Sequence, residues 1–526
     1  MQSINTKNRS TLFHVCAALI FLAAGGLVSA ALKFELTYDY LLYHHYNGFA
    51  FLNGRLGTDI APASVATYYN PLLDALLYKL NAFFRNDRGG YYFITGLPFG
   101  AMLFVLFEIS LLFFDFKTLK GKLCCAAVSI IGATGVAAWF QIGTATHEIP
   151  AAALVLSALY LILRFPDHKK TYAAAGFLLG AAAGLKLTAA VYCVSTGIAL
   201  ILSYRTLAKP KTFVAWLAAG GLAGFAATDG FWAVMLWNDF QNPFFPFWNK
   251  VFKSPFYLNE NYVDRLHLDG VTAFQLAFLP FYLINHPYTS NVGALQELTD
   301  FRFAALFVTA ACALAFRCRL SPVMKKAALW LGVSYVVWLT TAANLRFAVP
   351  VETLTAVVLV AAFSRWKKPA SLIGEALYLS AAVIGTAVFA STAVLSAPWG
   401  FGTRADILNE RVVLPENAVL ELYRFPLAGV AAEIAETNPT AKIVLYAPSD
   451  NQWHGWDIAR MGKMNGRRTD LIAKAAVRAA LFQDAFGLVY DENPELLNWD
   501  CRALDVSANF KTVLFSDVKL CIEPKK

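Results

Sequence analysis

Long apolar stretches recur along this chain of 526 residues and end near Ala397. A helix needs about 17 to 25 residues to cross a hydrocarbon core of about 30 Å, and most of these stretches reach or approach that length. Hydrophobic residues make up 58% of the sequence and charged residues only 15%, which excludes an ordinary soluble protein. The sequence therefore predicts an all-α polytopic membrane protein over residues 1–397.

Short basic segments between the apolar stretches predict the orientation, because short cytoplasmic loops carry an excess of Lys and Arg. If these segments are all cytoplasmic, an even number of crossings separates each from the next. The N-terminus is then cytoplasmic, and the two long loops, 33–91 and 237–301, lie outside with everything after residue 397. The count comes to about eleven spans: 12–32, 92–114, 123–143, 146–163, 172–185, 188–203, 213–236, 302–316, 327–343, 347–363 and 371–396.

The first span has a second interpretation, as a signal sequence, because "VSA" at 28–30 resembles a cleavage site. Its apolar run of about twenty residues exceeds the roughly 7 to 15 of a signal core, which favours a retained anchor. Either interpretation places residue 33 outside.

The chain changes character from Pro398 to Lys526, where polar residues are frequent and no apolar stretch is long enough to span. Short β-like runs at 441–447, 486–491 and 511–515 alternate with a helical pattern at 470–482, which predicts a small extracytoplasmic α/β domain. Cys501 and Cys521 are the two cysteines of this domain. Disulfides persist in oxidising compartments, so we predict that these two are bonded and resist alkylation in the unreduced protein.

Polar residues gather in very short turns on the predicted outer side. The basic loops on both sides of "AAAGLKLTAA" are predicted to be cytoplasmic, so the chain between them crosses the membrane twice. Its lysine then lies at the outer end of a shallow hairpin, where it either extends to the lipid headgroups or meets an anionic ligand. The sequences "TATHEIP" and "NLRFAVPVE" form two further outer turns. Together these turns carry His147, Glu148, Lys186, Arg346 and Glu352.

The first outer loop adds an acid close to the membrane. Read as a helix from Tyr38, it places Asp39 one turn from Tyr43, since residues four apart are neighbours on a helix. Further along, residues 72–84 carry a leucine stripe opposed by Asp74, which is typical of a helix lying in the membrane interface.

In this order, the motifs resemble those of polyprenyl-phosphate-sugar-dependent glycosyltransferases of the GT-C fold, closest to a bacterial mannosyltransferase-like branch. The resemblance covers roughly residues 10 to 395. The residues and motifs that carry it are Asp39, Tyr43, Gly54, Asp59, "TYYNP" (67–71), "QIGTATHE" (141–148) and "AAGFLLGAAAGLKLTA" (174–189).

This resemblance implies an inverting transfer of a sugar from a polyprenyl-phosphate donor to an acceptor hydroxyl. Asp39 is then the general base, and Lys186 and Arg346 stabilise the departing phosphate. The substrate-binding candidates are His44, His45, Asp59, Tyr69, Asn70, His147, Glu148 and Glu352.

The sequence predicts no dedicated metal site, because the adjacent His44 and His45 point in different directions on a helix and no HxxxH or HExxH spacing occurs. A loosely held divalent cation, Mg²⁺ or Mn²⁺, bridging carboxylate and phosphate stays open as an alternative. No glycine-rich nucleotide loop is present, which fits a lipid-linked donor. The net charge of +9 reflects the basic loops and does not indicate nucleic-acid binding.

The predicted partners are the polyprenyl-phosphate sugar donor, a lipid-linked or glycan acceptor, and membrane lipids. The resemblance also implies the bacterial inner membrane, with the C-terminal domain in the periplasm. Two alternatives come from other classes: a non-catalytic polyprenyl-lipid binding or assembly protein, and a secondary transporter. A transporter favours charges near the midplane and internal repeats, whereas these charges lie at the outer side.

Overall fold

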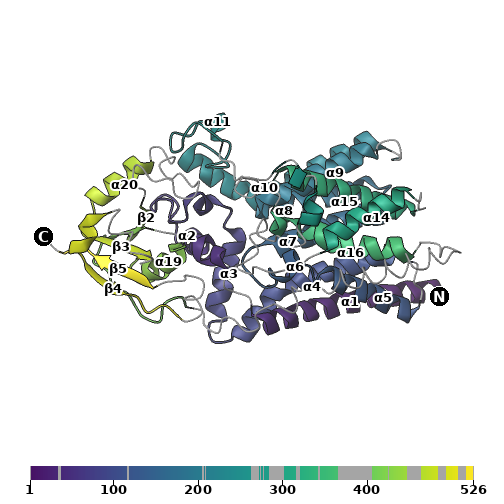
Figure 1. Ribbon diagram of the computed structural model, residues 1–526, viewed down its shortest axis with the longest axis horizontal. Helices are drawn as coiled ribbons and strands as arrows, with labels where there is room; N and C mark the ends of the chain where they lie inside the picture. Colours follow the sequence, from purple (N-terminus) through teal and green to yellow (C-terminus); the bar gives the residue numbers. More distant parts are fainter. Residues whose placement is uncertain are drawn as a thin grey trace.

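The helices of the N-terminal part form an elongated bundle, and a small sheet domain made by the C-terminal part lies at one end of it (Figure 1). In this computed structural model the two termini lie at opposite ends of the long axis. The structure describes residues 2–33, 37–114, 118–203, 207, 209–261, 272, 274–275, 278–282, 301–315, 320–341, 344–364, 406–423, 426–446, 464–483, 493–507 and 517–524.

A helix lies at each predicted span up to residue 363, and the span predicted at 371–396 lies outside the described residues. Four stretches are long and apolar enough to cross a membrane: Thr11–Leu32, Arg88–Phe113, Pro210–Phe240 and Leu345–Ala362. The total of eleven spans stays a prediction. The bundle helices are α1 (Gln2–Leu32), α4 (Arg88–Phe113), α5 (Leu119–Gly132), α7 (Glu148–Arg164), α8 (Lys169–Leu185), α9 (Ala190–Leu202), α10 (Pro210–Phe240), α14 (Arg302–Ala315), α15 (Pro322–Thr341) and α16 (Val349–Ser364).

Close packing of α8 against α10 fixes the place where the Lys186 turn begins. A Cβ on Gly180 would lie 1.9 Å from the carbonyl oxygen of Gly221, and one on Gly224 would lie 2.0 Å from that of Phe177. Small residues at such spacings let two membrane helices approach backbone to backbone. Helix α8 therefore ends in a fixed position, and Lys186 follows directly after it.

The first outer loop is mostly helical, and it turns its polar face inward. It contains a π-helical turn, η1 (Tyr40–His44), then α2 (His45–Leu52), a 3-10 turn η2 (Ser64–Tyr68) and α3 (Leu72–Phe83). Helix α3 exposes Leu76 and buries Asp74. Leu72 and Leu76 of the leucine stripe are exposed, as an interfacial helix requires, but Asp74 and Asn81 on the opposing side are buried against protein, which the sequence did not predict.

The described part of the second outer loop packs on the first. The rings of Phe240 and Phe245 stack on each other and meet Tyr68 edge-on, and Phe247 stacks on Tyr69. Short helices α11 (Asn249–Phe252) and α13 (Leu279–Tyr282) follow. These aromatic residues therefore hold the first outer loop against the end of α10 and the segment that follows it.

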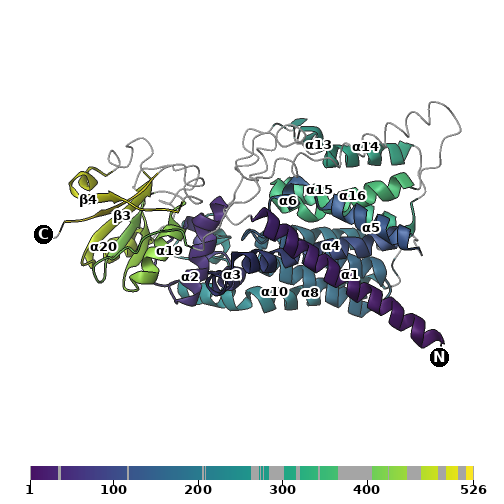
Figure 2. The same ribbon diagram turned by 90° about the horizontal axis from the view of Figure 1, so that it is seen from below.

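The C-terminal domain is a mixed sheet with helices against it (Figure 2). Its strand order is β2-β1-β3-β5-β4, with β1 parallel to β2 and β3, and β5 antiparallel to β3 and β4. The elements are β1 (Val419–Leu422), α19 (Ala428–Thr437), β2 (Lys442–Leu445), α20 (Met464–Ala473), β3 (Arg478–Gln483), η8 (Pro494–Asn498), β4 (Asp500–Ala503) and β5 (Val518–Ile522). Cys501 and Cys521 lie opposite each other on β4 and β5 and form a disulfide.

The helical prediction for 470–482 is wrong in its second half, where the chain forms β3. The alanines of this segment favour a helix in isolation, but as a strand they are fully buried between β1 and β5, so tertiary packing overrides local propensity. The predicted strand at 441–447 contains β2. Those at 486–491 and 511–515 lie outside the described residues.

The C-terminal domain is joined to the first outer loop by backbone pairing and by a hydrogen bond from a buried arginine. Ile60 donates its N–H to the carbonyl of Ile443 at 2.9 Å and accepts from Leu445 at 3.0 Å, so it extends the sheet beyond β2. Beside it, Arg55 donates to the carbonyl of Ala441 at 2.6 Å. The loop that carries the predicted site residues is thus held from both sides, by the bundle and by the sheet.

Candidate active site

Four ionisable side chains from separate segments meet at the end of the bundle that carries the first outer loop. Asp39 immediately precedes η1, and Glu148 is the first residue of α7. Lys186 follows α8, and Arg346 lies in the 3-10 turn η6 (Leu345–Ala348). We call these four residues the charge cluster. Three of them come from the outer turns that the sequence predicted to converge, and the fourth is the predicted base.

Arg346 is the centre of the charge cluster. Its Nη1 lies 2.5 Å from Oδ2 of Asp39, and its Nε lies 3.2 Å from Oε1 of Glu148. The backbone around it is also fixed: the Asn344 side chain accepts from the Arg346 N–H at 3.0 Å, and the Gln141 amide donates to the Arg346 carbonyl at 3.2 Å. The guanidinium is therefore held between two carboxylates.

The Lys186 side chain points into the protein, toward the other members of the charge cluster, which favours the second of its two predicted alternatives, contact with an anionic ligand. Its Nζ lies 2.6 Å from Oε1 of Glu148 and also donates to the carbonyl of Thr146. The side chains of Lys186 and Glu148 are only 13% and 4% exposed, whereas those of Arg346 and Asp39 are 18% and 16% exposed. Glu148 is thus the most buried residue of the charge cluster, and the Asp39–Arg346 pair is its most exposed part.

The environment of Asp39 keeps its carboxylate ionised. Burial by itself would raise the pKa, but the charges of Arg346, His44 and Lys186 and the hydrogen bond from Arg346 bring the pKa below its ordinary value of 3.8. The opposite charge within contact distance outweighs desolvation here. Paired in this way, Asp39 is a carboxylate at neutral pH but a weak proton acceptor until the guanidinium moves.

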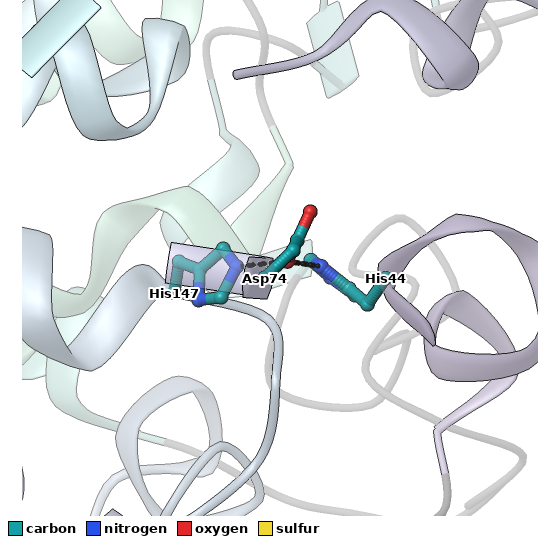
Figure 3. A group of neighbouring side chains, drawn as sticks. All are labelled: His44, Asp74 and His147. Atoms are coloured by element: carbon teal, nitrogen blue, oxygen red, sulfur yellow. Dashed lines mark hydrogen bonds and ion pairs between the residues drawn. The ribbon is translucent and has the colours of Figure 1, made fainter. Parts of the chain in front are cut away.

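A second group of ionisable residues lies next to the charge cluster and is shown in Figure 3. Oδ1 of Asp74 lies 2.7 Å from Nδ1 of His44 and 2.5 Å from Nε2 of His147. All three side chains are at most 7% exposed. Burial would raise the pKa of Asp74, but the two imidazoles and their hydrogen bonds hold it at about 2. We call these three residues the His–Asp–His group.

His147 links the two groups through the backbone. It is the N-cap residue of α7, directly before Glu148, and its φ of 66° lies in the left-handed region. A non-glycine residue there is strained, and such strain persists only where the surroundings fix it. The bond to Asp74 holds the His147 side chain, and so ties the start of α7 to the first outer loop.

Three further predicted residues line or support the same loop. Nδ1 of His45 lies 3.0 Å from the Tyr40 hydroxyl, within the loop itself. The Tyr69 ring meets that of Tyr43 edge-on. The Asn70 amide donates to the carbonyl of Gly184, at the end of α8, at 2.8 Å. Asn70 therefore connects the loop to the bundle just before Lys186, which is a structural contact.

Asp59 and Glu352, both predicted to bind substrate, have other contacts. The oxygens of Asp59 accept from Arg55, from the Tyr46 hydroxyl at 2.8 Å and from the Ile443 N–H at 2.9 Å, in the junction with the C-terminal domain. Glu352 is fully buried, and its oxygens accept from the N–H groups of Ala137 and Ala138, each at 2.9 Å. Both carboxylates are thus bonded to protein groups away from the charge cluster, which corrects their prediction as substrate-binding residues.

Sequence reasoning missed Asp74 as a functional candidate. It was placed on the polar side of an interfacial helix, where a charged residue is ordinarily solvated. Only its partners distinguish it, and His44 and His147 lie 30 and 73 residues away. The one signal available was an acid facing away from a leucine stripe in a loop that also carries two histidines.

The solved structures that are similar to this chain include two of one protein and one of another. ArnT from Cupriavidus metallidurans bound to undecaprenyl phosphate has a TM-score of 0.52 at 12% identity, over 97% of this chain and 97% of that one. The same protein in the apo state has a TM-score of 0.43 at 14% identity, over 98% of each chain. The Archaeoglobus fulgidus oligosaccharyltransferase in the apo form has a TM-score of 0.47 at 12% identity, over 89% of this chain and 69% of that one.

No protein-family model matches the chain, and no curated protein matches its sequence. The likeness to ArnT extends over nearly the whole of both chains, including the C-terminal domain. The chain therefore has the GT-C fold.

Proposed function

We propose that this protein is an integral membrane glycosyltransferase. It moves a sugar from a polyprenyl-phosphate donor to an acceptor hydroxyl at the outer face of the bacterial inner membrane, with inversion at the anomeric carbon. The observation that carries the proposal is the charge cluster: a carboxylate 2.5 Å from a guanidinium, with a lysine beside them, at one end of a helix bundle. The fold supports it, and so does the undecaprenyl phosphate bound to ArnT.

The reaction requires few groups because the donor already carries a good leaving group. The acceptor oxygen attacks the anomeric carbon while the bond from that carbon to the phosphate oxygen breaks. Asp39 takes the proton of the acceptor hydroxyl. The electron pair of the broken bond stays on the polyprenyl phosphate, whose charge Arg346 and Lys186 stabilise. Arg346 suits a bidentate phosphate contact, and Lys186 acts as a point charge.

Donor binding also explains how a paired carboxylate becomes a base. A phosphate that takes Arg346 as its partner draws the guanidinium away from Asp39. Because the charge of Arg346 is the largest influence that lowers the pKa of Asp39, its withdrawal raises that pKa toward the value of an effective base. The carboxylate thus becomes basic only when a donor is in place.

Glu148 keeps both cations in position during this exchange. It lies within ion-pair distance of Lys186 and of Arg346 and is the least exposed member of the charge cluster. Two cations side by side repel each other, and a shared buried carboxylate offsets that repulsion. We therefore assign Glu148 a positioning role, and not contact with a sugar hydroxyl.

The test is sugar transfer by purified protein in detergent, from a panel of synthetic polyprenyl-phosphate sugars to a membrane-lipid extract. Wild type is compared with Asp39→Asn, and donor binding is measured for both. Transfer by wild type, and its loss in a variant that still binds donor, supports the proposal. The matched control is Asp239→Asn, because Asp239 is an exposed acid near the end of α10.

The alternative of a non-catalytic polyprenyl-lipid binding protein gives a different result in the same assay. Such a protein binds polyprenyl phosphate but transfers no sugar from any donor of the panel, and Asp39→Asn changes nothing. That outcome overturns the proposed enzyme.

A further inference from the structure

The His–Asp–His group brings together the side chains of a metal site from segments far apart in the sequence. His44 comes from η1, Asp74 from α3 and His147 from the turn before α7. One ligand atom from each lies within 4.8 Å of the others, and Figure 3 shows the carboxylate between the two rings. The sequence spacing argued against a dedicated metal site, but these residues have no regular spacing by which a sequence could reveal them.

We propose that His44, Asp74 and His147 bind a transition-metal ion of the zinc class, which fixes the first outer loop to the start of α7. The inference does not rest on the proposed glycosyltransferase reaction, because the ion is held by residues outside the charge cluster. Its role is positional: it fixes His147, and through the backbone it fixes Glu148.

The ligand types select the metal. Two imidazoles and one carboxylate suit zinc and its neighbours, whereas Mg²⁺ and Ca²⁺ prefer oxygen ligands alone. Three protein ligands leave one position of a tetrahedral zinc site for a water molecule. A metal ion at this site would also neutralise the buried Asp74 carboxylate, whose negative charge is otherwise stabilised only by its hydrogen bonds to the two rings among the described residues.

The distances fit a group that can close on an ion. With bonds of about 2.0 to 2.2 Å to nitrogen and oxygen, the ligand atoms of a tetrahedral zinc site lie roughly 3.3 Å apart. The present separations from Oδ1 of Asp74 are 2.7 Å to His44 and 2.5 Å to His147. These two pairs therefore have to open by about 0.6 and 0.8 Å. The two imidazole nitrogens lie within 4.8 Å of each other, so rotations of the side chains can bring all three ligand atoms around one ion.

The hydrogen bonds of the group are also incomplete without another partner. Nε2 of His44 is buried and has no hydrogen-bond partner among the described residues. Buried polar atoms almost always have a partner in native proteins, and an exception points to an ion or a water. When a metal takes Nδ1 of His44, the ring proton belongs on Nε2, and an enclosed water molecule would then be the acceptor for that N–H.

The experiment measures metal directly, without donor or acceptor, so its failure is separate from failure of the proposed reaction. Protein purified in detergent without a polyhistidine tag is dialysed and its metal content determined by mass spectrometry. We expect about one zinc ion per chain. After chelation, titration with Co²⁺ should give the visible absorption bands of tetrahedral coordination, saturating at one equivalent.

Variants locate the ion. Asp74→Asn and His147→Gln should each lose the bound zinc and the Co²⁺ bands. The matched control is His45→Gln, since His45 is equally buried and adjacent to His44 but outside the group, and it should keep both. Zinc should also raise the unfolding temperature of chelated wild type, which needs no variant. The proposal is overturned if wild type binds no ion, or if both substitutions leave the stoichiometry and the Co²⁺ spectrum unchanged.

Discussion

Two arginine–carboxylate groups hold the first outer loop, one buried and one half-buried, and they differ in how completely they are bonded. At the junction with the C-terminal domain, Arg55 donates to both oxygens of Asp59 at 2.6 and 2.7 Å. Further hydrogen bonds link this pair to a tyrosine hydroxyl, a backbone N–H and a backbone carbonyl. In the charge cluster, Nε of Arg346 and both oxygens of Glu148 are buried without an aligned hydrogen bond among the described residues.

The difference indicates which arginine has a structural role. In a fully bonded buried network every polar atom already has a partner, so the network makes the fold rigid and offers no free donor to a ligand. An incompletely bonded one leaves donors that a ligand can use. The residue types are the same, but only Arg346 is in a position to exchange a carboxylate for a phosphate.

The largest expected effect concerns Asp39. Asp39→Asn removes the proton acceptor but keeps the shape, so sugar transfer should fall by roughly 10²- to 10⁴-fold, while the unfolding temperature changes little. Steady-state transfer and thermal unfolding measure the two quantities. If sugar transfer fell only as much as the amount of folded protein, Asp39 would have a structural role like that of Asp59, and the distinction between the charge cluster and the junction would be wrong.

Asp59→Asn should lower the stability of the protein and leave the rate of sugar transfer by the folded protein unchanged. It leaves the guanidinium of Arg55 buried without its charge partner, which costs about 3 kcal/mol in such pairs. We expect earlier unfolding of the C-terminal domain, seen as faster limited proteolysis between that domain and the bundle. The part of the protein that stays folded should retain its turnover number. A variant as resistant as wild type would show that the junction does not depend on this pair.

Arg346→Lys sharpens the comparison, because it keeps the charge and removes the planar fork. The KM for the donor should rise on the order of tenfold, since lysine cannot bind phosphate in a bidentate manner. The same change at Arg55 should leave the KM unaltered and lower the thermal stability instead. Donor titrations of both variants provide the measurement, and a raised KM in Arg55→Lys alone would invert our assignment.

The smallest expected effect is on pH dependence. The pKa of Asp39 in the free protein lies below 3.8, so stability from its pair with Arg346 is present above the usual carboxyl pKa and is lost only as the pH falls through the lowered value. The profile of kcat/KM, which reports the free enzyme, should therefore show no acid limb from Asp39 above about pH 5. In the donor complex the raised pKa should appear as an acid limb in kcat. If kcat/KM does show an acid limb, and its midpoint pH changes in Asp39→Glu, Asp39 titrates in the free enzyme and the prediction is wrong.

Much of the charge cluster was predictable from the sequence because loop charge sets orientation. The even number of crossings between basic loops predicts that Lys186, Glu148 and Arg346 lie on one side of the membrane, and very short turns limit how far apart they can lie. The number of crossings does not say which charges pair. Glu352 lies in a predicted outer turn but caps a short helix, α6 (Val136–Trp139), inside the bundle, so sharing a side of the membrane did not mean sharing a site.

Contacts between the two parts of the chain were beyond sequence reasoning. Asp59 looks like an outer-loop acid until the C-terminal domain is placed against it, and its partner Ile443 is 384 residues away. Asp74 was hidden by the same cause, since its partners come from other turns. Local patterns identify helices and faces, but pairing between distant segments depends on the assembled fold.

The strand pairing of Ile60 bears on how the C-terminal domain can be handled. Because that residue pairs with the outer edge of β2, the first outer loop covers part of an edge that the C-terminal domain leaves open. A fragment beginning after residue 397 would free the Leu445 N–H and the Ile443 carbonyl, and uncovered strand edges are where chains aggregate. A peptide spanning the Ile60 segment, added in trans or fused to the fragment, is therefore the natural solubilising partner for work on that domain alone.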